Sequence, residues 1–122
     1  MKFYICEHCG NIVTFVENKG VPVMCCGQRM TELVPGTVEA SQEKHIPVAE
    51  QKDGIVTVKV GAAEHPMAEE HYIQWIALET EQGCQIKYLR PGQKPQAVFA
   101  LAEGDAVVSV YAYCNLHGLW KK

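Results

Sequence analysis

One group of side chains combines four imidazoles with a single thiol. Its members are His45, His65, His71, Cys114 and His117, and the last two are spaced so that one turn could present both to the same ion. Structural zinc in proteins is almost always bound by four ligands. Five donors that mix nitrogen with one soft sulfur favour a metal of higher coordination number, such as iron with one position left open. This donor set indicates a redox enzyme rather than a scaffold held together by metal.

A second group consists of four cysteines near the N-terminus. Cys6 and Cys9 form a Cys-x-x-Cys pair, and Cys25 and Cys26 follow as neighbours. Two thiolates from each of two turns can complete a tetrahedron around one ion. A structural zinc ribbon usually has two residues between the cysteines of its second pair, and adjacent cysteines should distort the tetrahedron. The ligand chemistry alone leaves iron and zinc open.

Six cysteines in 122 residues could instead form a disulfide framework. That reading expects an exported protein, and the segment from Met1 to Cys6 lacks the apolar stretch of a secretory signal. We therefore expect metal ligation and a cytoplasmic location. Cys84 belongs to neither group and is expected to be a free thiol.

Charge and hydropathy exclude two classes of partner. The formal net charge is −3 and the basic residues are scattered, so no basic footprint for nucleic acid is present. No apolar run approaches the roughly 20 residues that a membrane-spanning helix needs. We expect neither a nucleic-acid nor a membrane partner.

The elements that must position these residues divide into two regions. Residues 1–36 form a unit too small to bury much core, and units below about 40 residues usually need a metal, disulfides or a partner. Pro35-Gly36 is expected to be a linker. From residue 37 to 122 short apolar segments alternate with Gly and Pro turns, without any helical period, and a C-terminal Lys121-Lys122 is expected to be a frayed tail. The segments that we expect to be strands are 55–60, 71–79, 84–89, 97–101 and 106–113.

This pattern predicts an all-β fold, an antiparallel sandwich of immunoglobulin-like type. The histidines fall in loops or at strand ends. Loops on a rigid sandwich are where binding sites are commonly built.

Three segments carry a family resemblance: Glu43-Lys44-His45-Ile46-Pro47, the run from His65-Pro66 to His71-Tyr72, and Cys114-Asn115-Leu116-His117-Gly118. They resemble the motifs of superoxide reductases. The cysteine quartet resembles the desulforedoxin-like domain of the two-iron form, desulfoferrodoxin. The resemblance covers nearly the whole chain, and it implies an iron-binding domain at 1–36 and a superoxide reductase domain at 37–122.

The resemblance also implies roles for individual residues. His45, His65, His71 and His117 would bind iron in a square plane with Cys114 as axial ligand, leaving the sixth position for superoxide. Lys44 and Glu43 would be catalytic, with Glu43 able to take the vacant position on ferric iron. Cys6, Cys9, Cys25 and Cys26 would hold a second, rubredoxin-like iron.

The implied reaction is one-electron reduction of superoxide to hydrogen peroxide without release of dioxygen. Rubredoxin or a similar donor would supply electrons, and the protein would be a homodimer. Residue chemistry agrees, because an axial thiolate pushes electron density onto iron and a lysine beside a ligand attracts a small anion. Three alternatives stay open: a rubredoxin-like electron-transfer protein, a zinc-bound structural module and a superoxide dismutase. Glu43 and Lys44 could also be a solvated charged pair.

Overall fold

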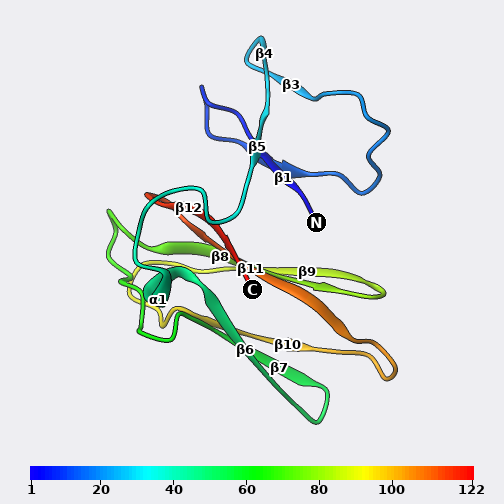
Figure 1. The fold of residues 1–122 in the computed structure, drawn as a ribbon, viewed down its shortest axis with the longest axis vertical. Coiled ribbons are helices and arrows are strands. Elements are labelled where there is room, and N and C mark those ends of the chain that lie inside the picture. The colour runs from blue at the N-terminus through cyan, green and yellow to red at the C-terminus, as the bar shows by residue number, and fades with distance from the viewer. The chain divides into compact units, whose positions relative to one another are not determined.

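The computed structural model describes all 122 residues, in two compact units, Met1–Val34 and Pro35–Lys122 (Figure 1). In the first unit a three-stranded antiparallel sheet has the order β2-β1-β5, and a two-stranded ribbon pairs β3 with β4. These strands are β1 (Phe3–Ile5), β2 (Ile12–Thr14), β3 (Met24–Cys25), β4 (Gln28–Arg29) and β5 (Thr31–Leu33). The buried apolar side chains of this unit are only Phe3, Cys6 and Met30. So small an apolar core is a weak source of stability for a unit of this size.

The second unit is a sandwich of two antiparallel sheets. One sheet has the order β10-β7-β6 and the other β12-β11-β8-β9. The strands are β6 (Pro47–Lys52), β7 (Ile55–Val60), β8 (Ile73–Thr80), β9 (Gly83–Tyr88), β10 (Gln96–Ala100), β11 (Val107–Cys114) and β12 (Gly118–Lys121). One buried cluster includes side chains from both sheets, so they share a single core. The predicted all-β sandwich is confirmed.

The pleat of the strands explains which side chains enter this core. In β7, Val56, Val58 and Val60 are buried whereas Ile55 and Lys59 are exposed, as alternation along a half-buried strand requires. Strands β8 and β11 instead bury consecutive residues. Strand β11, which leads directly into the Cys114 to His117 segment, is therefore buried over most of its length.

Two expectations for the region after residue 37 are wrong. A single helical turn, α1 (Gln42–His45), lies in a region expected to be β throughout, and it is too short to give a helical period in the sequence. Lys121 does not fray, because it ends β12 and pairs with Tyr111. The strands expected from the sequence lie within two residues of those observed, whereas β6 and β12 were not expected. As α1 is the only helix, no helix has the length and apolar character for a membrane crossing.

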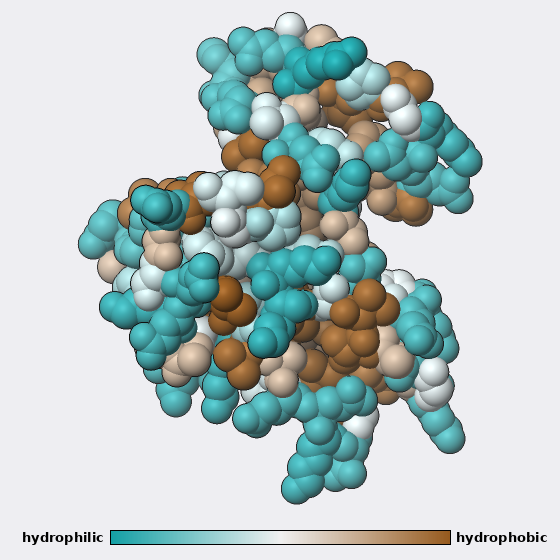
Figure 2. Space-filling view, viewed as in Figure 1, coloured by the Kyte–Doolittle hydropathy of each residue, from teal (hydrophilic) through white to brown (hydrophobic).

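Hydrophilic side chains cover most of the face in Figure 2, with apolar side chains gathered in several separate patches. The large apolar residues exposed in the second unit include Val48, Ile55, Tyr88, Val98, Val108 and Leu116. Exposed apolar residues of this kind are normal on protein surfaces.

Candidate metal centres

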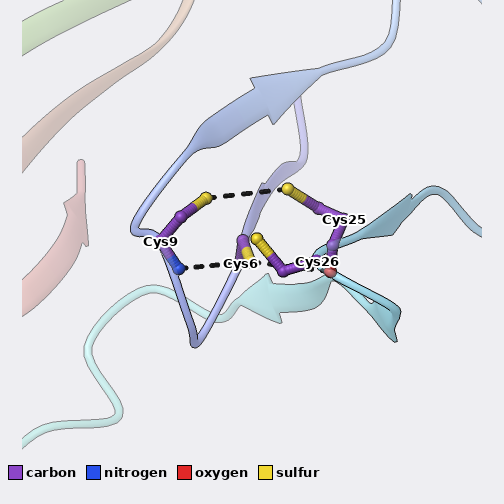
Figure 3. Close-up of side chains that lie close together, drawn as sticks. All are labelled: Cys6, Cys9, Cys25 and Cys26. Atoms are coloured by element: carbon purple, nitrogen blue, oxygen red, sulfur yellow. Dashed lines mark hydrogen bonds between the residues drawn. The ribbon is translucent and has the colours of Figure 1, made fainter.

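The four N-terminal cysteines converge in the first unit. Their sulfur atoms all lie within 4.8 Å of one another, and Figure 3 shows them pointing toward a common centre. Cys6 and Cys9 come from the turn between β1 and β2, where the Cys9 N–H lies 3.5 Å from the Cys6 sulfur. Cys9 Sγ and Cys25 Sγ are 3.6 Å apart. Four soft donors this close fit one tetrahedral metal ion.

The adjacent cysteines reach the same centre because of a tight hairpin. Cys25 is the last paired residue of β3, opposite Gln28. Cys26 and Gly27 form the two-residue loop, with φ values of 51° and 73°. A two-residue loop with both φ values positive has the sign pattern of a type I′ turn, which suits the twist of short hairpins. The pairing of Cys25 and the left-handed backbone of Cys26 allow neighbouring residues to supply two donors.

The thiols of this cluster differ in acidity. The backbone hydrogen bond from Cys9 lowers the pKa of the Cys6 thiol to about 6. Hydrogen bonding with Cys9 raises the pKa of Cys26 to about 12, and hydrogen bonding with Cys6 raises the pKa of Cys25. The Cys6 thiolate forms readily, whereas the thiols of Cys25 and Cys26 keep their protons. A bound cation would remove this conflict, because a coordinated thiol is deprotonated by the ion.

In the second unit the four predicted histidine ligands form a closed ring. Neighbouring imidazoles have centroid distances of 4.6 Å (His45 and His65), 4.7 Å (His65 and His71), 5.1 Å (His71 and His117) and 4.9 Å (His117 and His45). Each neighbouring pair is nearly perpendicular, at 79° to 83°. The diagonal from His45 to His71 is longer, 6.4 Å. The four centroids, with short sides and a longer diagonal, therefore have the outline of a square.

Hydrogen bonds decide which nitrogen faces inward in two of the four rings. The Nδ1 atoms of His45 and His65 lie 2.7 Å and 2.6 Å from the carbonyl oxygens of Ser41 and Pro66. Since a carbonyl only accepts, Nδ1 carries the proton in both rings and Nε2 has a free lone pair. These two Nε2 atoms are 3.1 Å apart. Two lone pairs at that distance repel each other unless a cation lies between them.

Burial keeps the imidazoles of His45, His65 and His71 neutral. Desolvation lowers the pKa of His65 to about 4 and also lowers the pKa values of His45 and His71. The Nε2 atom of His71 is buried without a hydrogen-bond partner. A buried unpaired nitrogen is costly in a protein interior, and a metal ion would satisfy it. The donor set therefore fits a bound metal ion.

Cys114 brings the sulfur to this ring from the end of β11. It is fully buried, and burial raises the pKa of its thiol. The donor atoms of His45, His65, His71 and Cys114 all lie within 4.8 Å of one another. His117 is outside this compact group, but its Nδ1 lies 3.1 Å from His45 Nε2 and 3.9 Å from the Cys114 sulfur. The fold thus brings all five predicted donors together.

Two residues that the sequence did not single out, Gly61 and Trp120, support the ring of imidazoles. Gly61 lies against α1, and a Cβ atom there would come 2.5 Å from the Glu43 carbonyl oxygen. Trp120 donates from Nε1 to the His117 carbonyl at 3.1 Å, and its ring lies 4.8 Å from that of His45. In the sequence Gly61 indicated only a turn, and Trp120 was assigned no role. Nothing local could have shown that they contact the ring.

Lys44 and Glu43 are exposed on α1, immediately before His45. Desolvation is the main cause of the lowered pKa values of His45 and His71, and the positive charge of Lys44 lowers both further. Lys44 therefore lies close enough to the ring to act on its electrostatics.

Comparison with known proteins follows the division of the chain. A family model described as Desulfoferrodoxin matches residues 37–122. A desulfoferrodoxin of Desulfarculus baarsii is 46% identical over 121 residues, covering 99% of this chain and 94% of that protein. The chain belongs to the desulfoferrodoxin family. A second relative, a desulfoferrodoxin of Nitratidesulfovibrio vulgaris, is 42% identical over 120 residues and covers 98% of this chain and 94% of its own.

Solved structures of this family show the same relationship. The superoxide reductase from Treponema pallidum superimposes with a TM-score of 0.83, at 38% identity, over 98% of both chains. The superoxide reductase (1Fe-SOR) from Giardia intestinalis covers 66% of this chain and 95% of its own, with a TM-score of 0.54 and 34% identity. The predicted family, and with it the assignment to superoxide reductases, is confirmed. The two donor sets are consistent with the two iron centres of a desulfoferrodoxin.

Proposed function

We propose that this protein reduces superoxide to hydrogen peroxide at an iron ion held by His45, His65, His71, His117 and Cys114. The observation that carries the proposal is the ring of four imidazoles beside a buried thiol, in which the Nε2 lone pairs of His45 and His65 face each other. Iron bound there would supply one electron to superoxide. Two protons complete the product, so that superoxide, one electron and two protons give hydrogen peroxide.

The chemistry of the ligands suits an anionic substrate. Four neutral imidazoles leave most of the positive charge of a ferrous ion uncancelled, whereas the Cys114 thiolate removes one charge. Lys44 adds a positive charge at the edge of the ring and would raise the local concentration of superoxide. We propose Lys44 and Glu43, which are exposed on α1 beside the ring of imidazoles, as the catalytic side chains.

We further propose that the two units are functional domains, residues 1–36 and 37–122. In the first, Cys6, Cys9, Cys25 and Cys26 would hold a second iron that takes part in electron transfer. Rubredoxin or a similar small protein is the proposed donor. Four thiolates saturate a tetrahedral ion, which suits an electron carrier rather than a substrate site.

The first unit also supports the proposal of a homodimer. Its large exposed apolar side chains include Val16, Val21, Met24 and Val34, more than its own small core can cover. Sedimentation equilibrium should give twice the chain mass, and a monomer at micromolar concentration would contradict the dimer. A cytoplasmic location stays a prediction.

Product stoichiometry tests the proposed reaction. With reduced rubredoxin supplied, each superoxide consumed should yield one hydrogen peroxide and no dioxygen. Stoichiometric dioxygen release would reject the reductase in favour of a dismutase. Irons that accept electrons from reduced rubredoxin but are not oxidised by superoxide would favour an electron-transfer protein.

The steering role of Lys44 has its own test. Lys44→Ala should slow superoxide capture and weaken its dependence on ionic strength, because long-range attraction of an anion is screened by salt. Lys52→Ala is the control, since Lys52 is also exposed but ends β6 away from α1 in sequence. Equal salt dependence in the wild type and Lys44→Ala would reject the role.

A further inference from the structure

Three hydrogen bonds connect Asn115 to the backbone on both sides of His71. The Tyr72 N–H donates to Asn115 Oδ1 at 2.9 Å, and Asn115 Nδ2 donates to the Glu70 carbonyl at 3.0 Å. The Asn115 N–H donates to the Tyr72 carbonyl at 3.2 Å. His71 is therefore bracketed by a single side chain.

These contacts lie where the regular pairing of β8 and β11 breaks. Tyr113 is opposite Trp75, whereas the next residue, Cys114, is opposite Ile73, so one residue of β8 has no partner. Such an irregularity ends ladder pairing and changes the direction of the chain. The Asn115 amide group continues the connection past this point.

His71 needs this support more than its neighbours in the ring do. The rings of His45 and His65 are each held by a hydrogen bond from Nδ1 to a backbone carbonyl. Neither ring nitrogen of His71 has a hydrogen bond to a backbone carbonyl, and its backbone is held by a bridge to Ala68. The orientation of its ring therefore depends on its backbone and on packing against His65 and His117.

We propose that Asn115 is a positioning residue that sets the place of His71 relative to Cys114 and His117. It lies between those two donors in sequence, so its hydrogen bonds tie the segment that carries His71 to the segment that carries the thiol. It acts through the backbone and does not touch the ring centre. This inference rests on the proposed function, because it treats His71 as a metal ligand.

Cobalt(II) is a suitable probe for the full-length protein. Ring protons of histidines bound to Co²⁺ give strongly shifted NMR signals, so the number of imidazole ligands can be counted separately from thiolate ligands. The wild type should show four such sets of signals. In Asn115→Ala the His71 set should be lost or broadened, and Co²⁺ should bind the histidine centre about 10- to 100-fold more weakly, as expected when an outer partner of a ligand is removed.

Leu116→Ala is the matched control. Leu116 is in the same loop, is 57% exposed and is outside the three hydrogen bonds. This variant should keep four shifted imidazoles and the wild-type affinity. Equal losses in Asn115→Ala and Leu116→Ala, or four unchanged imidazoles in Asn115→Ala, would overturn the inference.

A measurement on the wild type keeps the test independent of whether the variant folds. In the metal-free protein the Tyr72 amide should exchange with solvent at least about 10-fold more slowly than an unprotected amide, because Asn115 accepts its hydrogen bond. Unprotected exchange at the Tyr72 amide would contradict the positioning role of Asn115. A wild type that shows no shifted imidazole would instead contradict the proposed iron site, so the two failures are distinguishable.

Discussion

The two metal centres differ in what holds their ligands in place. The cysteine centre lies in a unit whose buried apolar side chains are few, and Cys9 and Cys26 are exposed. The histidine centre lies at the ends of strands whose core includes Val56, Ile76 and Phe99. We infer that the first unit depends on its metal ion for folding, whereas the second unit folds on its apolar core and so holds its metal ligands in place.

The two centres also differ in the net charge that each would have with an ion bound. Thiolates in the first would more than neutralise a bound ion, and the acidity of Cys6 already favours a negative charge there. In the second, burial keeps the imidazoles of His45, His65 and His71 neutral by lowering their pKa values. An electron can enter a saturated anionic centre, but an anionic substrate is drawn to the centre that keeps positive charge.

Metal removal should have the largest effect on this comparison, because the two units should respond to it differently. In metal-free protein, amides of Phe3–Ile5 should lose their protection from hydrogen exchange, whereas those of Ile55–Val60 should keep it. Cys6→Ser should reproduce the loss in the first unit, and Cys114→Ser should leave both units folded. Retained protection of Phe3–Ile5 without metal would break the contrast.

A core substitution, in contrast to metal removal, should destabilise the second unit and leave the first unchanged. Phe99 is fully buried on β10, so Phe99→Ala should cost about 3 to 5 kcal/mol of unfolding free energy. Denaturant titration should show this loss in the transition of residues 35–122, with the absorption of the cysteine centre unchanged at low denaturant. Val98→Ala, at a site 45% exposed, is the control and should have little effect.

Acid should destabilise the metal-free second unit. The pKa of His65 is about 4 in the folded protein against an ordinary value of 6.5. Between these values the unfolded chain binds a proton that the folded chain does not, so stability is complete above about pH 6.5 and falls toward pH 4. The full shift corresponds to roughly 3 kcal/mol. Denaturation of metal-free protein at several pH values checks this, and His65→Gln should make the profile less steep, with the remaining slope due to His45 and His71, whose pKa values are also lowered.

The smallest change tests how closely the sandwich supports α1. Gly61→Ala would push against the Glu43 carbonyl and should cost about 1 to 3 kcal/mol, as overpacking usually does. The Co²⁺ spectrum of the histidine centre should shift while that of the cysteine centre does not. Gly83→Ala is the matched control, because a Cβ there meets nothing within 4 Å. An unchanged spectrum in Gly61→Ala would show that α1 can move without disturbing the ring.

Much of the fold could be predicted from the sequence because local signals carry it. Alternation in 55–60 and the turn residues between segments correctly indicate the strands of the sandwich. The single turn of α1 could not be predicted, because four residues are too few for a helical period. Strand β12 was missed because its apolar residues, Leu119 and Trp120, are too few to reveal a pairing with distant β11.

The sequence by itself determined the donors and their division into two sets, because ligand type and local spacing are chemical properties of the chain. Only the tertiary structure decided that the Nε2 atoms of His45 and His65 face each other at 3.1 Å, since these residues lie 20 positions apart in the chain. The same holds for the supports of the ring, Gly61, Trp120 and Asn115. Their contacts join residues far apart in the chain, and such contacts exist only after the sheets have packed.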